Sequence, residues 1–118
     1  MIVVHHLNNS RSQRILWLLQ ELNLEYEVKP YQRDSVTNLA PITLTLIHPL
    51  GKSPIITDGN ITVAESGAII EYLIGAYYKK GAEGHLTVPQ RGTEVHRQYK
   101  YWLHFAEGTL MPPLVAKL

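Results

Sequence analysis

The sequence contains no cysteine among its 118 residues. This excludes disulfide bonds, thiolate metal sites and any redox or nucleophilic chemistry of a cysteine within the chain. The sequence also lacks a run of about 18 apolar residues, the length that a membrane-spanning helix needs. Residues 1–10 lack the charged and apolar regions of a signal peptide. With no other targeting segment in the sequence, we expect a cytoplasmic protein with no membrane partner.

The sequence also has no large excess of positive or negative residues. The 11 Lys and Arg residues nearly balance the 10 Asp and Glu residues. No basic stripe stands out, so nucleic acid is not an expected partner. The six histidines show no spacing that would hold a metal ion. His5 and His6 are adjacent in an expected strand and should point to opposite faces of the sheet. We therefore expect no metal site.

The hydrophobic pattern that is present predicts an α/β domain. Short β-rich runs are expected at 2–7, 24–31, 53–57 and 61–64, and Asp58-Gly59-Asn60 predicts a hairpin turn between the last two. Apolar residues at helical spacing predict helices over 11–22 and 65–78, and we expect another over 38–47. The order β-α-β-α-β-β-α corresponds to a mixed sheet with helices on both faces, in which Pro30 indicates an edge strand.

A linker with glycine and proline is expected at 81–91, followed by a long helix that begins near residue 92. This helix has an apolar stripe, and almost nothing is left in the sequence to bury it. Pro112 and Pro113 should end or kink the helix. We hypothesise that the chain is a fragment, a truncated product, or a protein that completes its fold by association.

The proline at position 54 follows a Gly-Lys-Ser turn and precedes an apolar strand. A cis peptide bond at Ser53-Pro54 would turn the neighbouring backbone groups outward, where an extended peptide could pair with them. A trans proline at the start of a strand explains the same sequence equally well.

Glu65 and Ser66 stand where a helix is expected to begin. The helix N-terminus and the Ser66 hydroxyl suit a carboxylate, and Glu65 suits an α-ammonium group, so the pair could recognise an amino-acid zwitterion. Thr62-x-x-Glu65 is also a capping-box pattern, and capping explains each residue taken singly.

Asn9, Ser10 and Ser12 lie between the first strand and the first helix. Ligands of open α/β sheets bind at the carboxyl ends of strands, where a hydroxyl could donate a hydrogen bond to a thiolate. Ser10-x-x-Gln13 is a capping box as well, so the alternative is that Ser10 only caps the helix.

Three segments in this order and spacing resemble the thioredoxin-like N-terminal domain of cytosolic glutathione S-transferases, and most of all the bacterial and fungal serine-type members. The segments are NSRSQRILWLL at 9–19, HPLGKSP at 48–54 and AESGAIIEYL at 64–73. The resemblance covers about residues 1–80. In addition, 101–113 resembles the first helix of that family's all-α second domain. The implied organisation is a glutathione-binding domain at 1–80, a linker at 81–91 and the start of a helical domain at 92–118.

The resemblance implies a role for each matching residue. Pro54 would be the family's cis-proline, and Ser53 would offer its backbone to the cysteinyl part of glutathione. Glu65 and Ser66 would hold the γ-glutamyl end, and Lys52 would lie near the glycyl carboxylate.

The implied thiolate donor is Ser10. Asn9 takes that place if the loop is aligned differently, and Ser12 is a third candidate. The implied function is glutathione transfer to small electrophiles by a homodimer, with glutathione as a co-substrate and no cofactor. The alternative is a non-catalytic glutathione-binding or protein-interaction module of the same fold.

Overall fold

In the computed structural model of the chain, residues 1–77 and 88–117 are described. The contacts divide the chain into two compact units, Met1–Leu86 and Thr87–Leu118. Most of the linker expected at 81–91 lies outside the described residues, so the three-part organisation stays a prediction.

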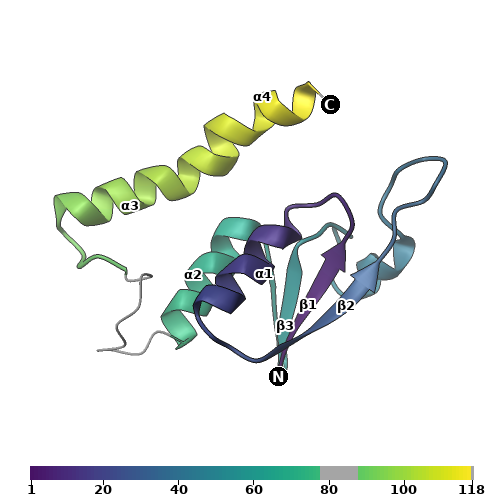
Figure 1. The fold of residues 1–118 in the computed structure, drawn as a ribbon, viewed down its shortest axis with the longest axis horizontal. Coiled ribbons are helices and arrows are strands. Elements are labelled where there is room, and N and C mark those ends of the chain that lie inside the picture. Colours follow the sequence, from purple (N-terminus) through teal and green to yellow (C-terminus); the bar gives the residue numbers. More distant parts are fainter. Residues whose placement is uncertain (78–87, 118) are drawn as a thin grey trace. The chain divides into compact units, whose positions relative to one another are not determined.

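The first unit is built on a four-stranded mixed sheet (Figure 1). Its strands are β1 (Ile2–Leu7), β2 (Tyr26–Tyr31), β3 (Ile55–Asp58) and β4 (Ile61–Ala64), in the order β2-β1-β3-β4. β1 is parallel to β2 and antiparallel to β3, and β3 pairs with β4 in the expected hairpin. Pro30 lies in β2 at the edge of the sheet, as its missing N–H group predicts.

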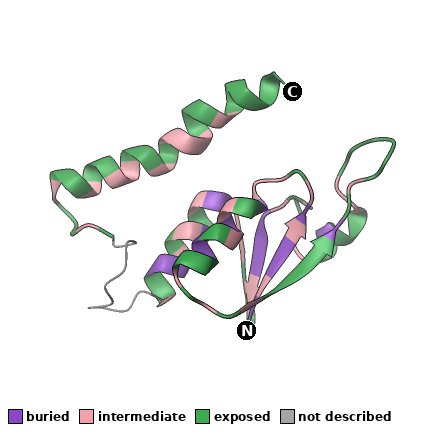
Figure 2. Ribbon diagram, viewed as in Figure 1, coloured by how far each residue is buried: buried purple, intermediate pink, exposed green. Residues whose placement is uncertain are grey.

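Two helices, α1 (Ser12–Glu21) and α2 (Ser66–Tyr77), pack against one face of the sheet and against each other. The alternation of side chains along β1 directs Ile2 and Val4 to this face. The main hydrophobic core forms there from Ile2, Val4, Ile15, Leu18, Leu19, Ile56, Ile69, Leu73 and Ile74. Figure 2 shows this buried layer along the sheet and the inner sides of both helices.

The expected helix over 38–47 is wrong in kind and in length. The structure has a single short 3₁₀ helix, η1 (Ile42–Leu46), after Pro41 in an extended conformation. Only Leu44 of this segment is buried, where it packs with Leu7, Tyr31 and Ile55 in a second, smaller core. With one inward residue rather than an apolar stripe, the segment lacks the packing that would sustain an α-helix.

His5 is a buried polar residue beside the second core. Its Nδ1 atom lies 2.9 Å from the Tyr31 hydroxyl, and its Nε2 atom lies 3.3 Å from the Thr57 hydroxyl. Burial, with a smaller effect of the Lys29 charge, lowers the pKa of this imidazole. His5 is therefore a hydrogen-bonded core residue, and the alternation predicted for the two adjacent histidines directs His6 to the opposite face.

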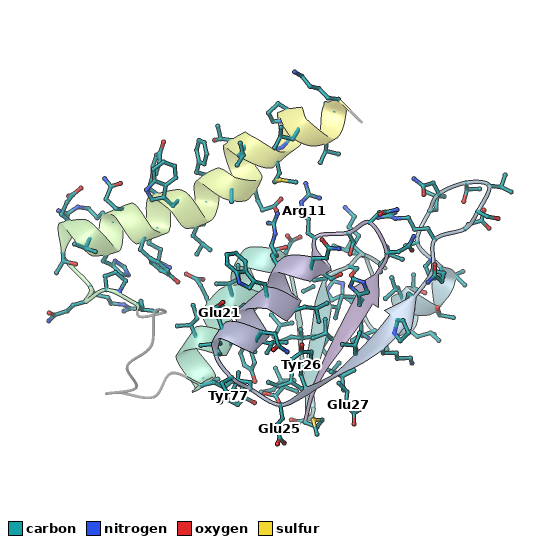
Figure 3. All side chains as sticks on the ribbon, viewed as in Figure 1. Arg11, Glu21, Glu25, Tyr26, Glu27 and Tyr77 are labelled. Carbon is teal, nitrogen blue, oxygen red and sulfur yellow. The ribbon has the colours of Figure 1, made fainter. Side chains whose placement is uncertain are left out.

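A polar cluster ties α2 to the end of the sheet where β1 begins. The hydroxyls of Tyr72 and Tyr77 donate to Oδ2 of Asp58 at 2.8 Å and 2.5 Å, and the amino group of Met1 lies 3.9 Å from Oδ1. Figure 3 labels Tyr77 at this end of α2, and Arg11 at the other end of the helix pair, where α1 begins. The cluster holds the pKa of Asp58 below its ordinary value and raises the pKa of Tyr77 to about 12.

The second unit is a run of helical turns. α3 (Glu94–Phe105) begins after Thr93, whose hydroxyl accepts from the His96 N–H group at 3.1 Å. A π-helical turn, η2 (Ala106–Leu110), leads into α4 (Met111–Ala116), which carries Pro112 and Pro113 in its first turn. The α-helix α3 thus ends at Phe105, before the prolines, and the prolines are accommodated in the first turn of α4, where N–H donors are not needed. None of the described residues of this unit is buried (Figure 2).

Candidate functional site at the carboxyl end of β1

Four chain segments meet at one end of the sheet, where β1 ends and β3 begins. His5 of β1 pairs with Ile55 of β3, and Ile55 pairs with Ala64 of β4. Ser53-Pro54, just before β3, and Glu65-Ser66, just after β4, are therefore at neighbouring positions next to the carboxyl end of β1. Both α1 and α2 begin at this edge (Figure 1). All the site residues predicted from the sequence thus lie at one end of the first unit.

The peptide bond between Ser53 and Pro54 is cis, the first of the two alternatives that the sequence left open. The Ser53 hydroxyl donates to the His5 carbonyl at 2.9 Å and accepts from the Leu7 N–H group at 3.3 Å. These bonds attach the segment to β1 beyond the last pair of the strand ladder. Lys52 is exposed beside it.

The hydroxyls of Ser12 and Ser53 both lie within hydrogen-bonding reach of the Ser10 hydroxyl. The Ser10 hydroxyl donates to the Leu7 carbonyl at 2.7 Å and lies 2.8 Å from the Ser12 hydroxyl and 3.4 Å from that of Ser53. The predicted capping role of Ser10 is wrong, because α1 begins at Ser12 with Arg11 at the N-cap position. The Ser10 hydroxyl bonds the carbonyl at the end of β1 instead, and no capping box forms with Gln13.

The three candidate thiolate donors differ in exposure. Ser12 is fully buried, and its hydroxyl is 2.5 Å from Nδ1 of His6 as well as 2.8 Å from Ser10. Ser10 is half-buried and Asn9 is exposed. A ligand can thus approach Ser10 or Asn9, whereas Ser12 lies behind Ser10. Sequence reasoning missed His6, although the alternation of side chains along its strand already assigned it to the face that carries α1.

The loop that holds Asn9 and Ser10 is bound by Arg33, a second residue that sequence reasoning missed. The Arg33 guanidinium donates to the carbonyls of Asn8, Asn9 and Asn38 at 3.0, 3.0 and 3.1 Å. Its backbone N–H group donates to the Asn8 side chain at 2.9 Å. Asn9 and Asn38 both have positive φ angles, 51° and 60°, which asparagine tolerates better than most residues. No sequence pattern singles out Arg33 within its polar loop.

The turn between β4 and α2 is formed by Glu65, which has a φ of 75° and is exposed. Its carbonyl accepts the Ile69 N–H group at 2.9 Å, so Glu65 stands at the N-cap position and α2 begins at Ser66. The capping box predicted with Thr62 is wrong, because Thr62 lies within β4. Ser66 is buried, and its hydroxyl makes no hydrogen bond to the described residues. This first turn of α2 therefore presents N–H groups and a hydroxyl next to the cis-proline.

Among the described residues, no group of three His, Asp or Glu side chains is arranged to hold a metal ion. None of the described helices combines the length and the apolar character needed to cross a bilayer.

The family model that matches residues 1–75 is "Glutathione S-transferase, N-terminal domain". The chain belongs to this family. The predicted thioredoxin-like fold, a mixed sheet followed by a further helix, is thereby confirmed together with the resemblance itself.

Similar proteins come from fungi and bacteria. The chain is 45% identical over 112 residues to glutathione S-transferase 3 of Schizosaccharomyces pombe, covering 95% of the chain and 43% of that protein. It is 40% identical to glutathione S-transferase 1 of Saccharomyces cerevisiae, covering 98% of the chain and 49% of that protein. A glutathione S-transferase crystal structure from Actinobacillus pleuropneumoniae, 40% identical, superposes with a TM-score of 0.81 over 90% of the chain and 47% of its own. The chain thus spans about half the length of these relatives.

Proposed function

We propose that the chain is the glutathione-binding part of a glutathione transferase, which conjugates the thiol of glutathione to small electrophiles. The observation that carries the proposal is the convergence of Ser10, the cis Ser53-Pro54 bond and the first turn of α2 at one sheet edge. Relatives that are 40–45% identical over nearly the whole chain are named glutathione S-transferases. Glutathione acts as a co-substrate in this proposal, and no cofactor takes part.

In this proposal Ser10 stabilises the thiolate of glutathione. A free thiol has a pKa of about 8.5, and each unit of lowering requires about 1.4 kcal/mol of preferential stabilisation of the anion. One hydrogen bond to a charged acceptor contributes about 1.5–3 kcal/mol. A single hydroxyl at the place of Ser10 thus lowers the pKa of the thiol by about 1–2 units, which makes a substantial share of the thiol ionised near neutral pH.

The remaining residues hold the backbone and the charged ends of the tripeptide. The free N–H groups and the hydroxyl at the start of α2 suit the α-carboxylate of the γ-glutamyl end, and the exposed Glu65 carboxylate suits its ammonium group. Ser53, before the cis bond, offers its backbone to the cysteinyl residue. Lys52, exposed next to Ser53, pairs with the glycyl carboxylate.

A homodimer in the cytoplasm completes the proposal. The exposed aromatic side chains of α3 support association, since Tyr101 and Trp102 are 54% and 58% exposed. Trp102 packs edge to face with Tyr101 and with Phe105, and the rings of Tyr101 and Phe105 are stacked. Aromatic residues of this kind are enriched at protein interfaces.

The test compares Ser10→Ala with Asn9→Ala in the same chain. We expect Ser10→Ala to bind glutathione within about threefold of the parent but to lose about 10–100-fold in conjugation of a generic aryl halide, which corresponds to the roughly 1.5–3 kcal/mol of one hydrogen bond to a charged group. Asn9→Ala should retain most of the turnover. Full turnover by Ser10→Ala would refute the assignment of the donor.

A second candidate function is a non-catalytic glutathione-binding or interaction module. The observation that favours it is the exposed pair Tyr101 and Trp102 on α3, because aromatic side chains of this kind suit a protein partner. Calorimetric binding of glutathione without any conjugation by the parent chain would support this alternative. Absence of both binding and turnover would overturn the transferase and the glutathione-binding module, and would favour a purely structural role.

A further inference from the structure

We infer that His6 is a positioning residue that orients the Ser10 hydroxyl toward the glutathione thiolate through the buried Ser12. The inference rests on the proposed function and concerns the same site. In this arrangement His6 does not touch the ligand, and it acts through the direction of a chain of hydrogen bonds.

The three side chains form one continuous chain. Nδ1 of His6 is 2.5 Å from the Ser12 hydroxyl, which is 2.8 Å from the Ser10 hydroxyl. The Ser10 hydroxyl in turn lies 2.7 Å from the Leu7 carbonyl oxygen. Ser12 is fully buried, so water does not compete for its hydroxyl group.

Counting protons fixes the direction of this chain. A carbonyl oxygen only accepts, so the short contact with Leu7 requires Ser10 to donate, and a serine has a single hydroxyl proton. The contact between the two serines must then be a donation from Ser12 to Ser10. Ser12 has now used its own proton, so the contact with His6 must be a donation from Nδ1–H. The structure therefore assigns the imidazole the Nδ1–H form on this side.

The opposite direction does not fit the contacts. If Nδ1 accepted from Ser12, the Ser12 oxygen would have to accept from Ser10. The Ser10 proton would then point inward to Ser12, and the 2.7 Å contact between the Ser10 hydroxyl and the Leu7 carbonyl would have no proton. Only the direction from His6 to Ser12 to Ser10 leaves the Ser10 proton at the accessible end of the chain.

The inferred direction makes Ser10 a better donor. Its oxygen accepts from the Ser12 hydroxyl at 2.8 Å and from the Ser12 backbone N–H group at 3.3 Å. Hydrogen bonds in series polarise one another, which strengthens the last donor. When a thiolate arrives, the Ser10 hydroxyl needs only to rotate from the Leu7 carbonyl to the sulfur, while both donations to its oxygen persist.

The experiment measures the pKa of the thiol of bound glutathione from the ultraviolet absorbance of its thiolate, in the full 118-residue chain. His6→Leu removes the donor with little change in volume, whereas His6→Asn keeps an N–H donor on the same carbon position. We expect His6→Leu to raise the pKa of the bound thiol by about 0.5–1 unit, which lowers the thiolate fraction and the conjugation rate below that pKa about 3–10-fold. We expect His6→Asn to restore most of the loss.

Two controls separate positioning from damage to the fold. Binding of S-methylglutathione, which has no thiol proton, should be unchanged in His6→Leu. Ser12→Ala should show the same loss, and the double variant should be no worse than either single variant, because both act through one chain of bonds. Parallel loss of S-methylglutathione binding, full additivity, or failure of His6→Asn to restore the pKa would each overturn the inference.

A measurement on the parent chain needs no variant. Imidazole ¹⁵N spectra should show the proton of neutral His6 on Nδ1, and a proton on Nε2 alone would overturn the inference while leaving the proposed function intact. If the parent chain instead binds glutathione without lowering its thiol pKa, the proposed catalytic function fails, and the inference fails with it.

Discussion

Removing the Arg33 guanidinium should loosen the loop that holds the candidate thiolate donors. The guanidinium bridges the carbonyls of Asn8, Asn9 and Asn38, and only the bond to Asn8 is partly buried. A hydrogen bond to a charged group is worth about 1.5–3 kcal/mol when buried and well under 1 kcal/mol when exposed. For Arg33→Met we therefore expect a loss of about 2 kcal/mol in the free energy of unfolding.

Arg33→Lys is the matched variant, because it keeps the charge but not the planar fork. A single ammonium group cannot reach three carbonyls in different directions, so we expect Arg33→Lys to recover less than half of the loss. The bond from the Arg33 backbone to the Asn8 side chain survives both substitutions. Urea unfolding followed by circular dichroism measures both losses at the same pH.

The same variants should weaken the site, since Asn9 and Ser10 belong to the loop that Arg33 binds. We expect the dissociation constant for glutathione to rise several-fold in Arg33→Met, with faster amide exchange in residues 8–10. Two outcomes would contradict this role of the Arg33 guanidinium. One is a loss of stability below about 0.5 kcal/mol in Arg33→Met, which is within the range of ordinary surface substitutions. The other is parent-like stability of Arg33→Lys.

Two further predictions concern stability. The hydrogen bond from Tyr77 is the largest cause of the lowered pKa of Asp58. The bond therefore stabilises the fold at pH values above the ordinary carboxyl pKa, and this stabilisation is lost as the pH falls through the lowered pKa. Tyr77→Phe should reduce the free energy of unfolding by about 1 kcal/mol near pH 7 and by much less near pH 2, as measured from urea midpoints. An equal difference at both pH values would contradict the role of the charge. Gly51 has a φ of 58°, and an added Cβ would meet Thr45 at 2.8 Å, whereas Gly59 has a φ of 61° with open space around it. Gly51→Ala should therefore lower the free energy of unfolding by more than the roughly 1–2 kcal/mol expected for Gly59→Ala. In a chain that also carries Thr45→Ala, the two glycine substitutions should lower it equally.

The sequence predicted the framework of the fold because its signals are local. The alternation in 2–7, the helical spacing in 11–22 and 65–78 and the turn at Asp58-Gly59-Asn60 each depend on residues a few positions apart. The helix expected over 38–47 was wrong because its conformation depends on Leu44 alone reaching the second core, which no local pattern reveals.

The sequence predicted which residues belong to the candidate site but not which contacts they make. The resemblance selected Ser10, Ser53, Pro54, Glu65 and Ser66, and the structure brings the segments that carry them to one edge of the sheet. The capping boxes that sequence patterns predicted from Ser10 and from Thr62 do not form, because α1 begins one residue later and α2 three residues later than those patterns indicate.

Periodicity and short motifs depend on residues close together in the chain, so the sequence alone was enough to predict most of the elements and the family resemblance. The contacts within the site became evident only in the folded chain, because they join residues from separate segments. The contacts of Arg33 with the loop at 8–9 and of Ser53 with β1 join residues 24 to 48 positions apart. The chain from His6 through Ser12 to Ser10 depends on the place where β1 ends against the start of α1. Hydrogen bonds have direction, and that direction is fixed only when donor and acceptor are brought together in space.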